Sequence, residues 1–139
     1  MVSTSMPASR PGARPGSWRR RAILVGAALI LVPSLLLALY TMAALRFAYS
    51  SGERAGYVQK FSRKGWVCKT WEGELAMVNL PGAMPEIFAF TVRDEAIATR
   101  LNATMGQRVA LTYEQHRGVP TACFGETEYF VTDVKPLAP

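Results

Sequence analysis

The feature that most constrains this chain is an uncharged apolar segment at residues 22–45. Its 24 residues are mainly Leu, Ile, Val and Ala. At about 1.5 Å of rise per residue, a helix of this length reaches about 36 Å. That length crosses a hydrocarbon core of about 30 Å with some tilt, so we predict a transmembrane helix here.

A cleaved signal peptide is the competing interpretation, because a basic region precedes the apolar segment. Signal peptides usually have apolar cores of about 7–15 residues, clearly shorter than this one. The length therefore favours a retained single-pass anchor, although cleavage stays open as an alternative.

Charge is distributed unevenly around the apolar segment. All 10 acidic residues follow it, whereas five of the 16 basic residues precede it: Arg10, Arg14, Arg19, Arg20 and Arg21. The positive-inside rule then places the N-terminus in the cytoplasm. We predict a disordered basic cytoplasmic tail at residues 1–21, the span at 22–45, and a small extracytoplasmic β-barrel-like domain at 46–139.

The last segment is rich in aromatic and β-branched residues and is divided by Gly-containing turns. The pattern predicts five strands, near residues 56–62, 66–78, 87–92, 108–115 and 129–134. A short helix is expected at residues 94–105, because Asp94 can cap it, Ile97, Leu101 and Met105 recur every four residues, and Gly106 can end it.

Three strands, one helix and two more strands follow the element order of the oligonucleotide/oligosaccharide-binding (OB) barrel. An SH3-like barrel or another small α+β sheet would give a similar string. We predict an N-terminal transmembrane helix followed by an OB-like five-stranded barrel with its helix between strands three and four.

Two stretches of this domain resemble a family of small uncharacterised bacterial single-span membrane proteins. They are YSSGERAGYVQKFSRKGWVCKTWEGEL, from Tyr49 to Leu75, and CFGETEYFVT, from Cys123 to Thr132. The resemblance implies a location in the bacterial cytoplasmic (inner) membrane and supplies no catalytic or binding residues.

Some members of that family carry the label 6-phosphogluconate dehydrogenase. Such an enzyme needs a dinucleotide-binding fold with a G-x-G-x-x-G turn, which this sequence lacks. About 90 extramembrane residues are also too few for that fold and a substrate domain. The sequence does not support the activity.

Cys68 and Cys123 are the only cysteines. The predicted topology puts both in an oxidising compartment, so we expect them to form a disulfide, with two independent buried thiols as the alternative. Neither belongs to a C-x-x-C motif, and with a single histidine they fall short of a zinc ligand set. We predict no metal and no cofactor.

Two pairs of glutamates and one pair of a glutamate with the histidine have the spacing of neighbours on one face of a strand. No nucleophile or second base accompanies them, so we expect an exposed strand end and solvated carboxylates rather than catalysis. The pairs are Glu114 with His116, Glu72 with Glu74, and Glu126 with Glu128.

Basic residues alternate with large aromatics across the first predicted hairpin, and this surface is the strongest candidate for binding a partner. It consists of Lys60, Arg63, Lys64, Trp66, Lys69 and Trp71. The predicted compartment favours an anionic glycan, a lipid headgroup or a protein over nucleic acid, which we exclude as a partner. Core aromatics with solvated charges are the plainer interpretation.

The sequence thus predicts a non-enzymatic, membrane-anchored binding or assembly module. Its expected partners are the lipid bilayer and a membrane or envelope protein. A small envelope hydrolase and a structural subunit of an envelope complex remain alternatives.

Overall fold

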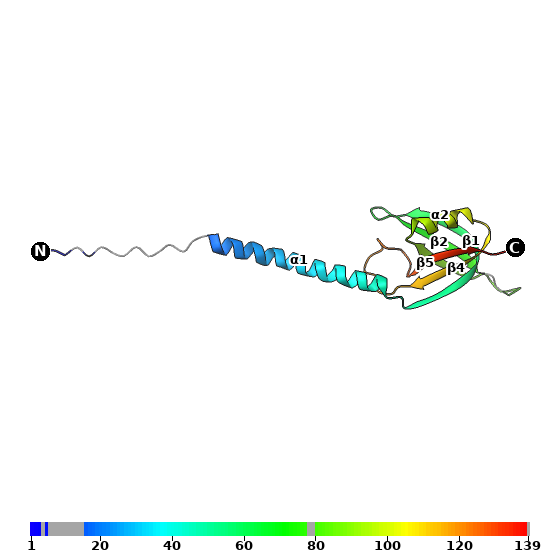
Figure 1. Ribbon diagram of the computed structural model, residues 1–139, viewed down its shortest axis with the longest axis horizontal. Coiled ribbons are helices and arrows are strands. Elements are labelled where there is room, and N and C mark those ends of the chain that lie inside the picture. The colour runs from blue at the N-terminus through cyan, green and yellow to red at the C-terminus, as the bar shows by residue number, and fades with distance from the viewer. Residues whose placement is uncertain (4, 6–15, 78–79, 139) are drawn as a thin grey trace. The chain divides into compact units, whose positions relative to one another are not determined.

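A computed structural model describes residues 1–3, 5, 16–77 and 80–138. The chain forms two compact units, Met1–Ala38 and Leu39–Pro139. Helix α1 (Gly16–Arg46) begins in the first unit, and its last two turns belong to the second. Figure 1 shows the order of the elements.

Helix α1 has the length and apolar composition of a membrane span, and a signal sequence would share both properties. It starts at Gly16, so the prediction of a disordered tail is wrong for residues 16–21. Arginine is a good helix former, and the three arginines before the apolar segment extend its helix. The tail prediction for residues 4 and 6–15 lies outside the described residues.

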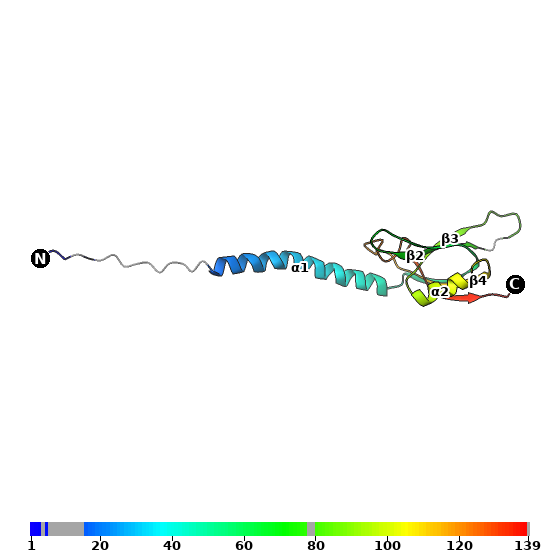
Figure 2. The ribbon, with the colours of Figure 1, turned by 90° about the horizontal axis from the view of Figure 1, so that it is seen from above.

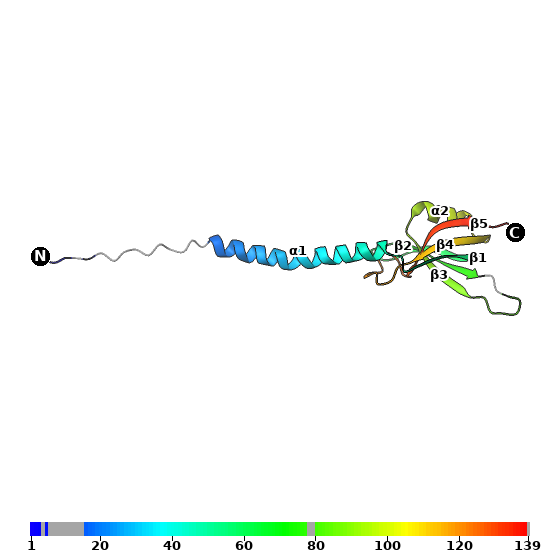
Figure 3. The same ribbon diagram turned by 60° about the horizontal axis from the view of Figure 1, so that its bottom comes forward.

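Five strands form a closed barrel in the order β1-β2-β3-β5-β4, and the predicted OB-like architecture is confirmed. Helix α2 (Glu95–Ala103) lies between β3 and β4 in the sequence, as expected. Figure 3 shows β4 lying between β1 and β5. The strands are β1 (Ser50–Lys64), β2 (Thr70–Met77), β3 (Ile87–Val92), β4 (Arg108–Gln115) and β5 (Tyr129–Pro136).

Strand β1 is longer than predicted because it serves two neighbours. Its first half pairs with β4, starting at Ser50 opposite Gln115, and its second half pairs with β2, ending at Lys64 opposite Thr70. A Cβ atom at Gly56, where the two pairings overlap, would clash with the backbone of β2. Glycine therefore permits the close approach that lets one strand join both sides of the barrel.

Strand β2 starts later than predicted. Gly65 has a φ of +133°, which favours glycine, and residues 65–69 form the β1–β2 loop instead of continuing a strand. Trp66 is consequently a loop residue rather than a strand residue.

The core lies inside the barrel and under α2, which Figure 2 shows beside the strands. Fully buried side chains include Leu75, Phe90 and Leu111 from three different strands. Helix α2 adds Ile97 and Leu101 to the same cluster. Its first turn is capped by Asp94, whose carboxylate accepts a hydrogen bond from the Ala96 backbone N–H at 2.8 Å.

Candidate ligand-binding face

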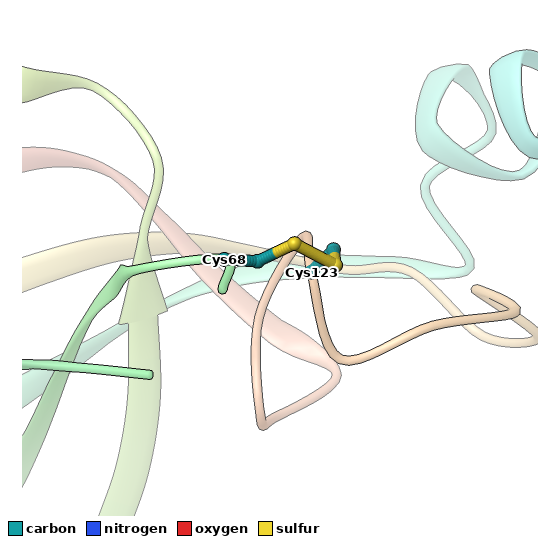
Figure 4. Close-up of a disulfide and its surroundings, with 2 residues drawn as sticks. All are labelled: Cys68 and Cys123. Atoms are coloured by element: carbon teal, nitrogen blue, oxygen red, sulfur yellow. A yellow bond between two sulfur atoms is a disulfide. The ribbon is translucent and has the colours of Figure 1, made fainter. Parts of the chain in front are cut away.

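Two loops of the barrel are held together by a disulfide. Cys68 lies in the β1–β2 loop and Cys123 in the β4–β5 loop (residues 116–128); the two sulfur atoms are bonded, and the Cα atoms lie 4.9 Å apart (Figure 4). In OB barrels, these two loops flank the outer face of β2 and β3 on which ligands bind. The disulfide therefore fixes the two sides of that face to each other.

The six residues of the predicted partner surface do not share one surface. Strand alternation sends Lys60 and Lys64 to the outer face of the barrel, whereas Arg63 faces the opposite way beside Trp71, its partner in the register. Trp66 stands apart at the tip of the loop, fully exposed.

Both lysines on the outer face have carboxylate partners. Lys60 Nζ lies 3.5 Å from Glu74 Oε1, and Lys64 Nζ lies 3.9 Å from Glu126 Oε2. The depression between them is small, about 80 Å³. Because the positive charges here are offset by neighbouring acids, this face is a weak site for an anion.

Glu72 lies on the same face but is buried, with 4% of its surface exposed. Its carboxylate accepts hydrogen bonds from the hydroxyls of Thr70 (2.6 Å) and Thr91 (2.7 Å) and from the backbone N–H of Glu126 (3.0 Å). The prediction of a solvated carboxylate is therefore wrong for Glu72. Its role is to tie the β4–β5 loop to β2 and β3.

Arg63, Lys69 and Trp71 meet around a pocket of about 280 Å³ that we call the basic pocket. Arg93, which follows β3, and Phe124, which follows the disulfide, complete its wall. Within the part of the chain that the structure describes, none of the three cations belongs to an ion pair. The basic pocket thus offers three exposed positive charges beside two aromatic rings.

Both aromatic rings of the basic pocket make contacts with neighbouring side chains. Trp71 stacks on Phe61 with ring centroids 5.1 Å apart and planes inclined by 12°. The indole N–H of Trp71 donates at 2.9 Å to Oε2 of Glu95, the one carboxylate that lines the pocket among the described residues. The Arg93 guanidinium lies 5.6 Å from the centre of the Phe124 ring.

The sequence analysis missed Arg93 and Phe124. Both lie outside the predicted hairpin, one beyond β3 and one in the β4–β5 loop. A signal for Phe124 was nevertheless present, because the expected disulfide brings the residue after Cys123 next to the β1–β2 loop. No comparable signal marked Arg93.

His116 is buried rather than exposed, so that prediction is wrong; 5% of its surface is accessible. Its Nδ1 lies 3.1 Å from the carbonyl oxygens of both Ala44 and Phe47, and its Nε2 lies 3.2 Å from Glu114 Oε2. Backbone carbonyls at the end of a helix lack intrahelical donors, and the His116 ring supplies one. The histidine therefore links the end of α1 to the barrel.

No group of three or more His, Cys, Asp or Glu side chains that could hold a metal ion occurs within the described residues.

The strand order and the position of α2 define an OB-type barrel preceded by an apolar helix. A solved structure with the same fold is the mitochondrial single-stranded DNA-binding protein Rim1 of S. cerevisiae, at 12% sequence identity and a TM-score of 0.51. The match covers 66% of this chain and 96% of that one. At this identity the likeness establishes the fold.

Residues 48–139 match DUF8785, a domain of unknown function, and the chain belongs to this family. The expected membership of an uncharacterised family is confirmed at that level. No curated protein matches the chain.

The exclusion of nucleic acid as a partner is wrong. It rested on the predicted compartment alone, and the barrel has the fold of a protein named for binding single-stranded DNA. Nucleic acid accordingly joins the ligand classes that a test of this barrel must include.

Proposed function

We propose that this chain is a membrane-anchored OB-fold module whose basic pocket binds an anionic ligand. Helix α1 would hold it in the bilayer, and the disulfide would keep the walls of the pocket in register. The observation that carries the proposal is a set of three cations, Arg63, Lys69 and Arg93, that have no ion-pair partner among the described residues and lie beside two aromatic rings.

The pocket suits a ligand that combines negative charge with a ring face that can stack on an aromatic side chain. Arginine and lysine attract phosphate or carboxylate groups, and Trp71 and Phe124 offer surfaces for a base or a sugar. The domain beyond the apolar segment has a net charge of only +1, so the attraction is local to the pocket rather than spread over the surface. A short single-stranded nucleic acid and an anionic polysaccharide share this chemistry.

An extracytoplasmic position of the domain is part of the proposal. The arginines before the apolar segment favour a cytoplasmic N-terminus, and a disulfide persists best outside the cytoplasm. A role without catalysis is proposed as well, since the one histidine is buried against backbone carbonyls.

The test is a binding titration with the full-length chain in lipid nanodiscs. Fluorescently labelled oligothymidylate and labelled polygalacturonate are the two probes, and anisotropy is measured at low and at physiological salt. We expect saturable binding of one probe that weakens as salt rises, because bound cations of the polymer are released on association. The probe that binds identifies the ligand class, and the absence of binding of both at low salt would contradict the proposal.

A further inference from the structure

The tip of the β1–β2 loop carries two apolar side chains that the barrel leaves uncovered. Trp66 has a relative exposure of 101% and Val67 of 95%. Exposed apolar surface of this kind can contact a membrane or another protein. We call these two residues the apolar tip.

The apolar tip lies at the end of the barrel to which α1 is attached. The disulfide joins its loop to the β4–β5 loop. That loop in turn contacts the last two turns of α1: the Tyr40 hydroxyl donates to the Gly118 carbonyl at 3.0 Å, and the His116 ring lies 3.1 Å from the Ala44 carbonyl. These turns and the barrel belong to the same unit, Leu39–Pro139.

Other residues at this end have the composition of a membrane interface. Phe47 and Tyr49 are 82% and 68% exposed directly after α1. The guanidinium of Arg117 lies 4.9 Å from the centre of the Tyr49 ring, and Arg46 occupies the last turn of α1. Trp and Tyr concentrate at the headgroup level of bilayers, and arginine there meets lipid phosphates.

We infer that the apolar tip rests in the headgroup layer of the bilayer that holds α1. The inference rests on the membrane anchor of the proposed function and is independent of ligand binding. Tyr40 and Ala44 fall within the apolar segment at residues 22–45, so loop residues hydrogen-bonded to them stand at the edge of the bilayer. Trp66 and Val67 then meet lipid rather than water.

Docking of the apolar tip fixes the domain at a second point beside α1. The basic pocket includes Lys69, which belongs to the same β1–β2 loop as the apolar tip, and Cys123, which is bonded to Cys68 of that loop. The pocket therefore opens close to the membrane surface, where it would meet a ligand that travels along that surface.

The test uses quenching of tryptophan fluorescence by brominated lipid, with the full-length chain in nanodiscs. The chain has three tryptophans, so Trp18→Phe serves as the background and leaves Trp66 and Trp71. Its matched control is the double variant W18F/W66F, which leaves only Trp71, the partly buried residue stacked on Phe61. Trp66 is fully exposed, so replacing it leaves the barrel intact.

We expect brominated lipid to lower the emission of W18F and to leave most of the emission of W18F/W66F. Equal fractional quenching of the two variants would overturn the inference. Alkaline carbonate extraction of cell membranes that contain the chain separates this failure from a failure of the anchor: a chain that stays in the membrane with Trp66 unquenched refutes only the inference. A chain that is extracted refutes both the anchor and the inference.

Discussion

Glu72 and Glu74 lie two positions apart on β2, and the barrel uses them in different ways. Glu72 is buried and accepts three hydrogen bonds, whereas Glu74 is more exposed and pairs with Lys60. The sequence predicts that both face the same side of a strand, and they do. It could not reveal which one is buried, because the donors to Glu72 come from three separate segments of the chain.

Replacing Glu72 by Ala should destabilise the domain much more than replacing Glu74 by Ala. The first change removes the shared acceptor of the Thr70 hydroxyl, the Thr91 hydroxyl and the Glu126 backbone N–H, and should cost about 3 kcal/mol. The second removes one exposed ion pair, worth about 0.5 kcal/mol. Urea unfolding followed by circular dichroism in detergent measures both, and equal midpoints for the two variants would refute the role assigned to Glu72.

At the scale of elements, the regular alternation of apolar and polar residues predicted the strands best. Strands β3 and β4 have the predicted bounds, and α2 differs by a residue or two at each end. The first half of β1 was missed because Gly52 and Gly56 interrupt its alternation. The β1–β2 loop was mistaken for strand because its Trp and Val have high β propensity, while Gly65 decides the local backbone.

Helix α2 and β5 are joined by an ion pair that makes stability depend on pH. Arg100 donates to Asp133 Oδ1 at 2.9 Å, and its other nitrogen donates to the Val134 carbonyl at 2.6 Å. The hydrogen bond from Arg100, helped by one from the Val134 backbone, lowers the pKa of Asp133 below its usual 3.8. A carboxyl group whose pKa is lowered by folding stabilises the folded state at pH values above its usual pKa. This contribution is lost as the pH falls through the lowered pKa.

Substituting Asp133→Asn should therefore flatten the acid side of the stability profile. We expect the variant to lose less stability than the unmodified chain between about pH 4 and pH 2, because the titrating group has been removed. Thermal unfolding over that range measures the difference. Parallel profiles for the two proteins would show that Asp133 does not contribute to the acid dependence.

The disulfide is the second link between elements, and removing it should cost more than any single ion pair. It closes a loop with a sequence separation of 55, for which the chain-entropy model gives about 4 kcal/mol. The double variant C68S/C123S should unfold at a clearly lower denaturant concentration than the oxidised chain. Reduced wild-type protein is the control, and an unchanged midpoint in both would contradict this role.

For the whole molecule, the sequence predicted the architecture better than the site. The apolar segment and the strand pattern are local signals, so a long apolar helix and an OB-like barrel followed from them. The basic pocket combines Arg63 and Lys69 with Arg93 and Phe124, which the register of β2 with β3 and the disulfide bring together. The predicted surface instead grouped residues that the strand pleat separates.

The most direct test of the basic pocket compares two double variants of equal charge. R63A/K69A removes two unpaired cations from the pocket, whereas K60A/K64A removes two cations that already pair with Glu74 and Glu126. Each is titrated in nanodiscs with the probe that the unmodified chain binds. We predict that R63A/K69A weakens binding about tenfold or more, equivalent to about 1.4 kcal/mol, while K60A/K64A changes it much less. Equal losses in the two variants, or no loss in R63A/K69A, would contradict the basic pocket as the binding site.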